Sequence, residues 1–190
     1  LEDWRPGDSE GHNHPYKGAS HSPDIAVVMP VFHKGALVGF SANTAHHVDI
    51  GAATPGLIID VPDMWAEGML LDAVKLYEAG NRVESLWKYI RDNTRVPDLV
   101  MGDLEAQIAS AELGVRRFEE LLEKYGKDDV ISSCNQLMDY TERLMRREIS
   151  KIPDGEYFAE GFLDDDGRNR DKTLPIKVCV KVNGDSVETV

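Results

Sequence analysis

Cysteine is scarce in this sequence, and long apolar runs are absent. The two cysteines, Cys134 and Cys179, are too few for a disulfide framework or a thiolate metal site. We expect both to be free, buried thiols in a reducing cytoplasm, with Cys134 on the apolar face of a helix. No apolar stretch approaches the ~20 residues that a membrane-spanning helix needs, so we expect no membrane partner.

Basic residues are also too few to form a positively charged face. The chain has 34 Asp and Glu residues against 21 Lys and Arg, which gives a formal net charge of -13. The acidic residues are spread along the whole chain, so a nucleic acid is not an expected partner. The Gly spacing and Lys of a phosphate-binding loop are missing as well, and the sequence therefore predicts no nucleotide site.

The 190 residues suffice for one ordinary domain with a hydrophobic core. The chain begins at Leu1 without an initiator Met and ends at Val190 in what resembles an unfinished strand, so we expect a fragment of a larger chain. We predict a mixed α+β fold in three parts, which belong together in one larger domain. These parts are a metal-site loop and β-hairpin region over residues 1–97, an antiparallel helix pair over 98–152, and the start of a C-terminal β region over 153–190.

The periodicity of apolar residues predicts the individual elements. Residues 1–24 fit neither a helix nor a strand and are predicted to form a loop. Two apolar, β-branched runs joined by His33-Lys34-Gly35 predict a hairpin whose strands are buried on both faces. Apolar spacings of three and four predict helices, and shorter β-type runs predict strands. The predicted strands are 25–32, 36–43, 69–77, 157–163 and 174–182 with a further one at the C-terminus, and the predicted helices are 83–93, 98–125 and 128–152.

Histidine is distributed unevenly, because all six histidines precede Val48. His21 and Asp24 stand three residues apart on a loop, and His46 ends the second strand of the hairpin. An antiparallel hairpin returns the chain to its starting point, so His46 is expected beside His21 and Asp24. Two imidazoles and a carboxylate are ligands for Mn, Fe(II) or Zn, but histidines that only form hydrogen bonds in a loop fit the same spacing.

The other histidines are assigned different places. Strand alternation allows only one of His46 and His47 to point inward. His12 and His14 are expected to position other groups rather than to bind metal. His33, in the hairpin turn, is expected to be exposed to solvent.

Several motifs stand in a fixed order along the chain. They are Arg5-Pro6-Gly7-Asp8, Asn13-His14-Pro15-Tyr16-Lys17-Gly18-Ala19-Ser20-His21-Ser22-Pro23-Asp24, Pro30-Val31-Phe32, Ala45-His46-His47-Val48-Asp49-Ile50-Gly51 and Gly102-Asp103-Leu104-Glu105-Ala106-Gln107-Ile108. Together they resemble the hydantoinase B/oxoprolinase family, and the resemblance covers nearly the whole chain. Within the family, the likeness is greatest to the large (alpha) subunits of acetone carboxylases. Hydantoinase-type members usually read Asn-Asp-Pro-Tyr where this chain has Asn13-His14-Pro15-Tyr16.

The resemblance implies a divalent metal, manganese before zinc or iron, held by His21, Asp24 and His46. His47 and Asp49 are then expected in catalytic roles, either orienting ligands or moving protons. ATP is expected to be used at a separate hydantoinase A-like partner subunit, with a small subunit as a second partner.

The function expected from the resemblance is an ATP-dependent ketone carboxylase that joins an enolate to carbon dioxide derived from bicarbonate. A divalent cation can stabilise the oxyanion of such an enolate. The alternatives are a component of an amide-ring hydrolase of the N-methylhydantoinase or 5-oxoprolinase type and a structural subunit without catalysis. The isolated segment is expected to be inactive in each case.

Overall fold

The computed structural model describes residues 4–58, 60–167 and 169–190. The chain divides into two compact units, Leu1–Gly126 and Lys127–Val190. Each unit combines helix with antiparallel sheet, so the predicted α+β class is confirmed. None of the helices in the described part is both long enough and apolar enough to cross a membrane.

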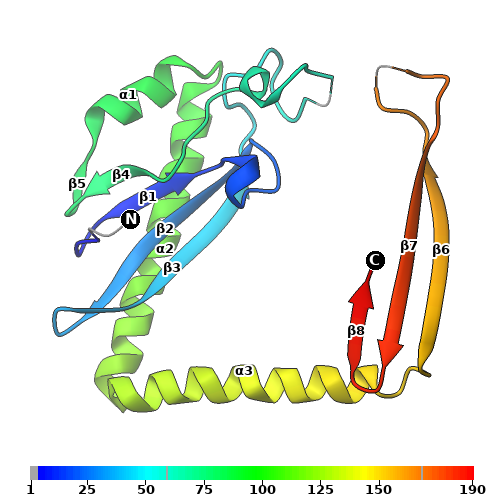
Figure 1. Ribbon diagram of the computed structural model, residues 1–190. Helices are drawn as coiled ribbons and strands as arrows, with labels where there is room; N and C mark the ends of the chain where they lie inside the picture. Colours follow the sequence, from blue (N-terminus) through cyan, green and yellow to red (C-terminus); the bar gives the residue numbers. More distant parts are fainter. Residues whose placement is uncertain (1–3, 59, 168) are drawn as a thin grey trace. The chain divides into compact units, whose positions relative to one another are not determined.

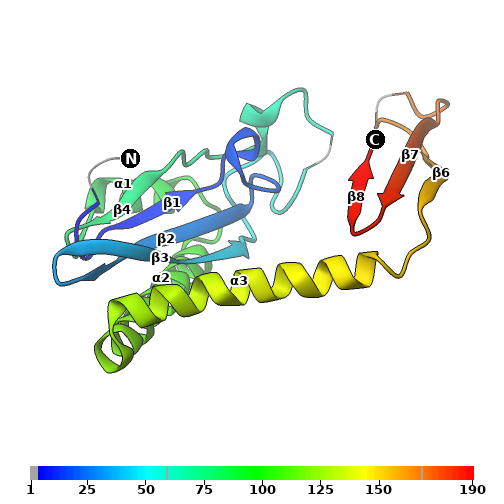
Figure 2. The same cartoon turned by 60° about the horizontal axis from the view of Figure 1, so that its bottom comes forward.

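The first unit is built on a five-stranded antiparallel sheet with the strand order β3-β2-β1-β4-β5. Figure 2 shows β4, β1, β2 and β3 side by side in this order. The strands are β1 (Ser9–His12), β2 (Asp24–His33), β3 (Ala36–His46), β4 (Val74–Glu78) and β5 (Asn81–Arg82), and the helices are η1 (Pro15–Lys17), η2 (Met64–Glu67), α1 (Glu84–Asp92) and α2 (Pro97–Tyr125).

The predicted hairpin is present as β2 and β3. Lys34 and Gly35 form its turn with φ values of 51° and 82°, as a tight hairpin turn requires. The expectation that both strands are buried on both faces was wrong, because β3 is an edge strand whose side chains are all at least partly exposed. Residues 69–77 were predicted to form one strand. In the structure only the C-terminal part of this range is a strand, β4.

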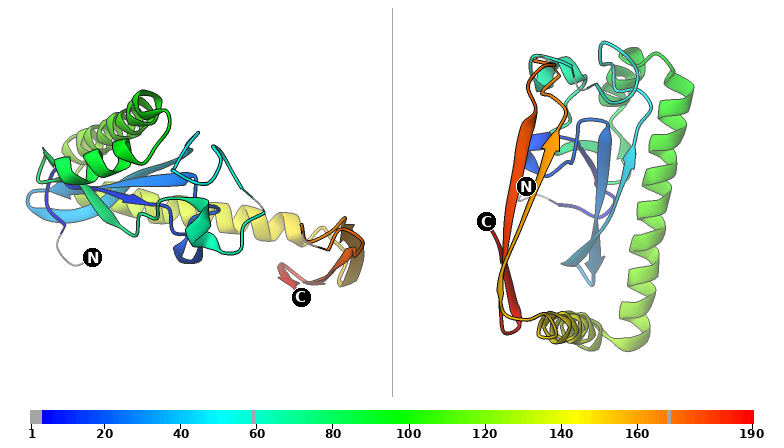
Figure 3. Two further views of the ribbon diagram at one scale, coloured as in Figure 1. Left: turned by 90° about the horizontal axis from the view of Figure 1, so that it is seen from above. Right: turned by 90° about the vertical axis from the view of Figure 1, so that its right-hand side faces the viewer.

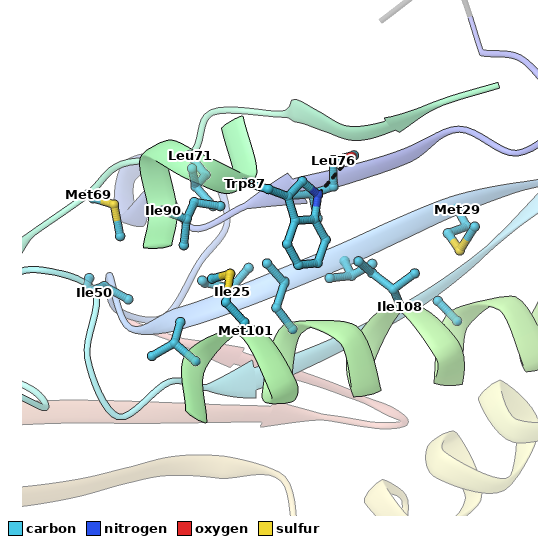
Figure 4. Close-up of a cluster of buried hydrophobic side chains, with 14 residues drawn as sticks. Ile25, Met29, Ile50, Met69, Leu71, Leu76, Trp87, Ile90, Met101 and Ile108 are labelled. Atoms are coloured by element: carbon cyan, nitrogen blue, oxygen red, sulfur yellow. Dashed lines mark hydrogen bonds between the residues drawn. The ribbon is translucent and has the colours of Figure 1, made fainter. Parts of the chain in front are cut away.

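The core lies between one face of this sheet and the helices α1 and α2 (Figures 1 and 3). Alternate residues of β2 are buried on that face, as the two-residue period of a strand demands. Trp87 of α1 lies in the same core, and its indole N–H donates to the Leu76 carbonyl at 3.0 Å (Figure 4). The largest members of the cluster include Ile25, Met29, Leu76, Trp87, Ile90, Leu104 and Ile108.

The strand β1 is the main error of the sequence prediction for this unit, because residues 1–24 were expected to form a loop. β1 is the central strand of the sheet. Its Gly11 lies so close to the core that a Cβ there would be 3.2 Å from the Leu76 side chain. Asp8 precedes the strand with a fully buried carboxylate that accepts from Ala79 N–H at 2.7 Å and Lys75 Nζ at 2.9 Å. The polar residues of this segment therefore form buried hydrogen bonds within the sheet, as Asp8 does, instead of forming a solvent-exposed loop.

The second unit contains one helix and a three-stranded antiparallel sheet with the order β6-β7-β8. Arg146 of the helix lies 3.5 Å from Asp185 in the turn that precedes the last strand. The strands match the predicted C-terminal β region, and this unit consists of α3 (Lys127–Ile149), β6 (Gly155–Leu163), β7 (Leu174–Asn183) and β8 (Ser186–Thr189).

Two predictions for the helices have different outcomes. Cys134 on α3 is exposed rather than buried, and Cys179 is partly exposed, so the expectation of buried thiols was wrong. The helices at 98–125 and 128–152 are present as α2 and α3, but they fall in different compact units. Their antiparallel packing and the division at residues 97 and 152 stay predictions.

Candidate metal centre

The structure brings His21, Asp24 and His46 together at one end of the β2-β3 hairpin. Asp24 is the first residue of β2, and His46, the last of β3, is its direct cross-strand partner. His46 Nδ1 lies 2.9 Å from Asp24 Oδ1, and His21 Nδ1 lies 3.0 Å from Asp24 Oδ2. One donor atom from each of the three residues can be chosen so that all lie within 4.8 Å of one another. The predicted convergence of these side chains is therefore present in the geometry.

The residues fit a divalent cation. Donors bound to one ion at ~2.1 Å lie at most about 4.2 Å apart, so the observed spread requires only a small contraction. His21 Nδ1 is buried and its approach to Asp24 does not have the geometry of a hydrogen bond. Among the described residues this ring nitrogen has no hydrogen-bond partner, so its lone pair could bind a cation placed beside Asp24. Two imidazoles and one carboxylate suit Mn²⁺, Fe²⁺ or Zn²⁺.

The loop that carries His21 is fixed by Asn13, a residue for which the sequence analysis predicted no role. The fully buried Asn13 amide donates to the carbonyls of Ser22 at 2.7 Å and Met69 at 2.9 Å, and its oxygen accepts from Leu71 N–H at 2.6 Å. Ser22 Oγ in turn donates to Glu67 at 2.6 Å. The position of Asn13 inside the histidine-rich motif was the only sequence feature that pointed to it.

His47 faces the opposite way from His46, as strand alternation predicted. It is 1% exposed, and its Nε2 lies 2.6 Å from Gln107 Oε1 of α2. The Gln107 amide group donates to the Ile25 carbonyl at 2.9 Å and to Asn43 at 3.0 Å. His47 thus belongs to a buried polar network that connects the hairpin to α2.

Asp49 is also buried, in a network of its own. Its carboxylate accepts from Gly51 N–H at 3.0 Å and from the backbone N–H and guanidinium of Arg95. Burial alone would raise the pKa of Asp49, but the backbone N–H groups of Arg95 and Gly51 and the Arg95 charge outweigh it, so this pKa lies below its ordinary value. Neither His47 nor Asp49 is part of the donor cluster around Asp24. Their catalytic roles stay predictions.

The remaining histidines lie outside the cluster. His14 caps η1, with its Nδ1 accepting from Tyr16 N–H at 3.2 Å. His12 Nδ1 lies 3.8 Å from Asp72 on the open face of the sheet. His33 was expected to be exposed, and this was wrong: it is 9% exposed and lies 3.4 Å from Glu123, because α2 extends along the whole hairpin.

Comparison with known proteins agrees with this architecture. Residues 1–189 match the family Hydantoinase B/oxoprolinase. The chain is 50% identical over 183 residues to the B component of a putative D-/L-hydantoinase from Pseudomonas sp. (strain NS671), covering 94% of this chain and 31% of that protein. It thus spans about a third of the length of such relatives.

Two solved structures share the fold. The crystal structure of an ATP-dependent caprolactamase from Pseudomonas jessenii is 33% identical, with a TM-score of 0.92 over 99% of this chain and 32% of the other. A nucleotide-free acetone carboxylase matches with a TM-score of 0.87 over 97% of this chain and 26% of the other, at 17% identity, which establishes a common fold alone. The match to the family over residues 1–189, together with the relative that is 50% identical, leads to one conclusion: this chain belongs to the hydantoinase B/oxoprolinase family.

Proposed function

We propose that this chain is the metal-binding segment of one subunit of an ATP-dependent hydrolase that opens cyclic amides. The observation that carries the proposal is the donor cluster of His21, Asp24 and His46 on an open face of the sheet. The relatives at 50% and 33% identity are named for cyclic amides, hydantoin and caprolactam, and this favours the same substrate class here.

The chemistry requires a polarised carbonyl and a nucleophile beside it. A divalent ion held by His21, Asp24 and His46, with manganese as the first candidate, would supply the Lewis acidity. Asp24 lies between the two imidazoles, and the hydrogen bonds of Asn13 hold the loop that carries His21. The ligand atoms are thus arranged before a substrate arrives, which lowers the cost of organising the site.

ATP would be used at a partner subunit. The sequence has no phosphate-binding loop, whereas the caprolactamase relative is ATP-dependent. A hydantoinase A-like subunit is the expected partner, with a small subunit as the third component of the assembly.

A ketone carboxylase is the second candidate. It is favoured by His14, which stands where hydantoinase-type members usually have Asp, and by the shared fold with acetone carboxylase. In the structure, however, the His14 ring accepts a hydrogen bond from Tyr16 N–H as an Asp carboxylate in that position would. His14 therefore preserves the helix cap that Asp would form, so its presence is weak evidence for a carboxylase.

The test uses the full-length protein with its ATP-binding partner subunit. Phosphate release from ATP is measured with hydantoin, with caprolactam, and with acetone plus bicarbonate. We expect stimulation by a cyclic amide, and loss of this stimulation together with the bound metal in His46→Ala. Stimulation by acetone plus bicarbonate alone would establish the second candidate, and wild-type protein without metal would favour a structural subunit.

A further inference from the structure

The sheet of the first unit has a second face, opposite the helices, and this face is hollowed. A cavity of about 600 Å³ lies on it, within the size range of small-molecule sites. Its walls combine aromatic and aliphatic side chains with ionisable groups. They include Trp4, Glu10, His12, Ala26, Val28 and Phe40.

The cavity lies on the same face of the sheet as the metal cluster. Asp24, Ala26 and Val28 are alternate residues of β2, so all three side chains point to one face, with about 7 Å between successive positions. His12 pairs with Ala26 and Glu10 pairs with Val28 across the β1-β2 ladder. The cavity therefore begins one step along β2 from Asp24 and extends away from it.

Glu10 is the unusual group in this cavity. It is 5% exposed, and no described residue forms a hydrogen bond or ion pair with its carboxylate. Burial raises the pKa of Glu10, and the positive charge of Lys75 offsets this only in part. His12 Nε2 is likewise buried without a hydrogen-bond partner among the described residues. Two such groups at one cavity are costly for folding alone and are typical of a binding site.

We propose that this cavity binds the substituent of the substrate that lies away from the reacting carbonyl, with Glu10 accepting a hydrogen bond from an N–H or ammonium group there. Trp4 and Phe40, whose rings meet edge to face at 5.3 Å, would cover the apolar part of the same substituent. This inference rests on the proposed function, since the metal cluster would hold the other end of the molecule. The ligand class is a cyclic amide with a donor-bearing side chain.

The experiment compares two hydantoins of equal side-chain length, 5-(3-aminopropyl)hydantoin and 5-butylhydantoin. Their affinities for the full-length protein with its partner subunit are measured by calorimetry without ATP, for wild type, Glu10→Gln and the control Glu112→Gln, which removes an exposed carboxylate on α2. We expect wild type and the control to prefer the amine, and Glu10→Gln to lose on the order of 10- to 100-fold in affinity for the amine only. Thermal unfolding of Glu10→Gln is expected at an equal or higher temperature than for wild type, because burial disfavours the charged form of Glu10, as its raised pKa indicates, and Gln carries no charge.

The outcomes separate this inference from the proposed function. Equal affinity of wild type for both hydantoins, absence of binding, or unfolding of Glu10→Gln at a lower temperature would overturn the subsite, even if hydantoin itself is turned over. Binding of the amine that depends on Glu10, with no turnover of any cyclic amide, would support the subsite and refute the proposed function.

Discussion

Replacement of Asp24 by Asn tests the metal centre most directly, because this carboxylate lies within 3.0 Å of both imidazoles. Asn has the same shape and can still form a hydrogen bond with His46, so the fold is expected to persist. It lacks the negative charge that a divalent cation attracts. Four-ligand zinc sites have binding free energies of roughly 10–16 kcal/mol, so one ligand contributes about 2.5–4 kcal/mol. We therefore expect the dissociation constant for Mn²⁺ to rise on the order of 10²- to 10³-fold.

The assay is a titration of metal-free, full-length protein with Mn²⁺, in which electron paramagnetic resonance distinguishes the free ion from the bound ion. Asp92→Asn is the matched control, because it removes an exposed carboxylate that pairs with Lys88 on the surface of α1. Wild type and Asp92→Asn are expected to bind one Mn²⁺ with equal affinity. An unchanged dissociation constant in Asp24→Asn would refute the assignment of this residue as a ligand.

Three further predictions concern the groups that support the site. Asp49→Asn is expected to lower the free energy of unfolding at neutral pH by about 1.5–3 kcal/mol. The pKa of Asp49 in the folded protein lies below the ordinary carboxyl pKa of about 3.9, so the stability difference between wild type and Asp49→Asn is fully present above that pH. It disappears as the pH falls through the pKa of folded Asp49. Denaturant titrations of both proteins between pH 7 and 3 will measure it. His47→Ala removes the partner of the buried Gln107 oxygen and is expected to lower the free energy of unfolding, measured from the urea midpoint, by about 1–3 kcal/mol. The Mn²⁺ affinity is expected to stay unchanged. A variant that is stable but inactive would instead support the predicted catalytic role of His47. Gly51→Ala is expected to destabilise the protein by roughly 2 kcal/mol or more in the same urea assay, since Gly51 has a φ of 79° and an added Cβ would lie 2.4 Å from the Asn93 carbonyl oxygen; an unchanged midpoint would show that this loop can move.

The arrangement of the donor cluster was predictable because it depends on local rules. His21 and Asp24 are three residues apart, and the two-residue turn at Lys34 and Gly35 returns the second strand beside the first. The turn alone would pair Asp24 with Ala45, and a register shift between Val31 and Phe32 places His46 opposite Asp24 instead. Strand alternation then separates His46 from His47. The hairpin therefore made the proximity of the three residues predictable, whereas the register shift that aligns Asp24 with His46 was not predicted.

The environment of the cluster was not predictable, because it depends on contacts between residues far apart in the sequence. Ser9 to His12 contains no β-branched or aromatic residue, and its place in the centre of the sheet is stabilised by β2 on one side and β4 on the other. The structural role of Asn13 was likewise not predicted, since its partner Met69 is 56 residues away and only its place in the motif pointed to it. His33 is buried because α2 is long enough to bring Glu123 to it.

The pairing that builds the core also fixes the positions of the proposed metal ligands. Asp24 and Ile25 are neighbours on β2 and point to opposite faces, so a slip of one residue would turn Asp24 toward the helices and Ile25 toward the open face. Such a slip would also expose Val27 and Met29, at a cost of about 1.5–3 kcal/mol for each of the three apolar side chains. The sum of roughly 5–9 kcal/mol is comparable to the whole stability of a typical domain. The hydrophobic core therefore holds Asp24 opposite His46 without any contribution from a bound ion, and the metal-free protein is expected to keep its ligands in register.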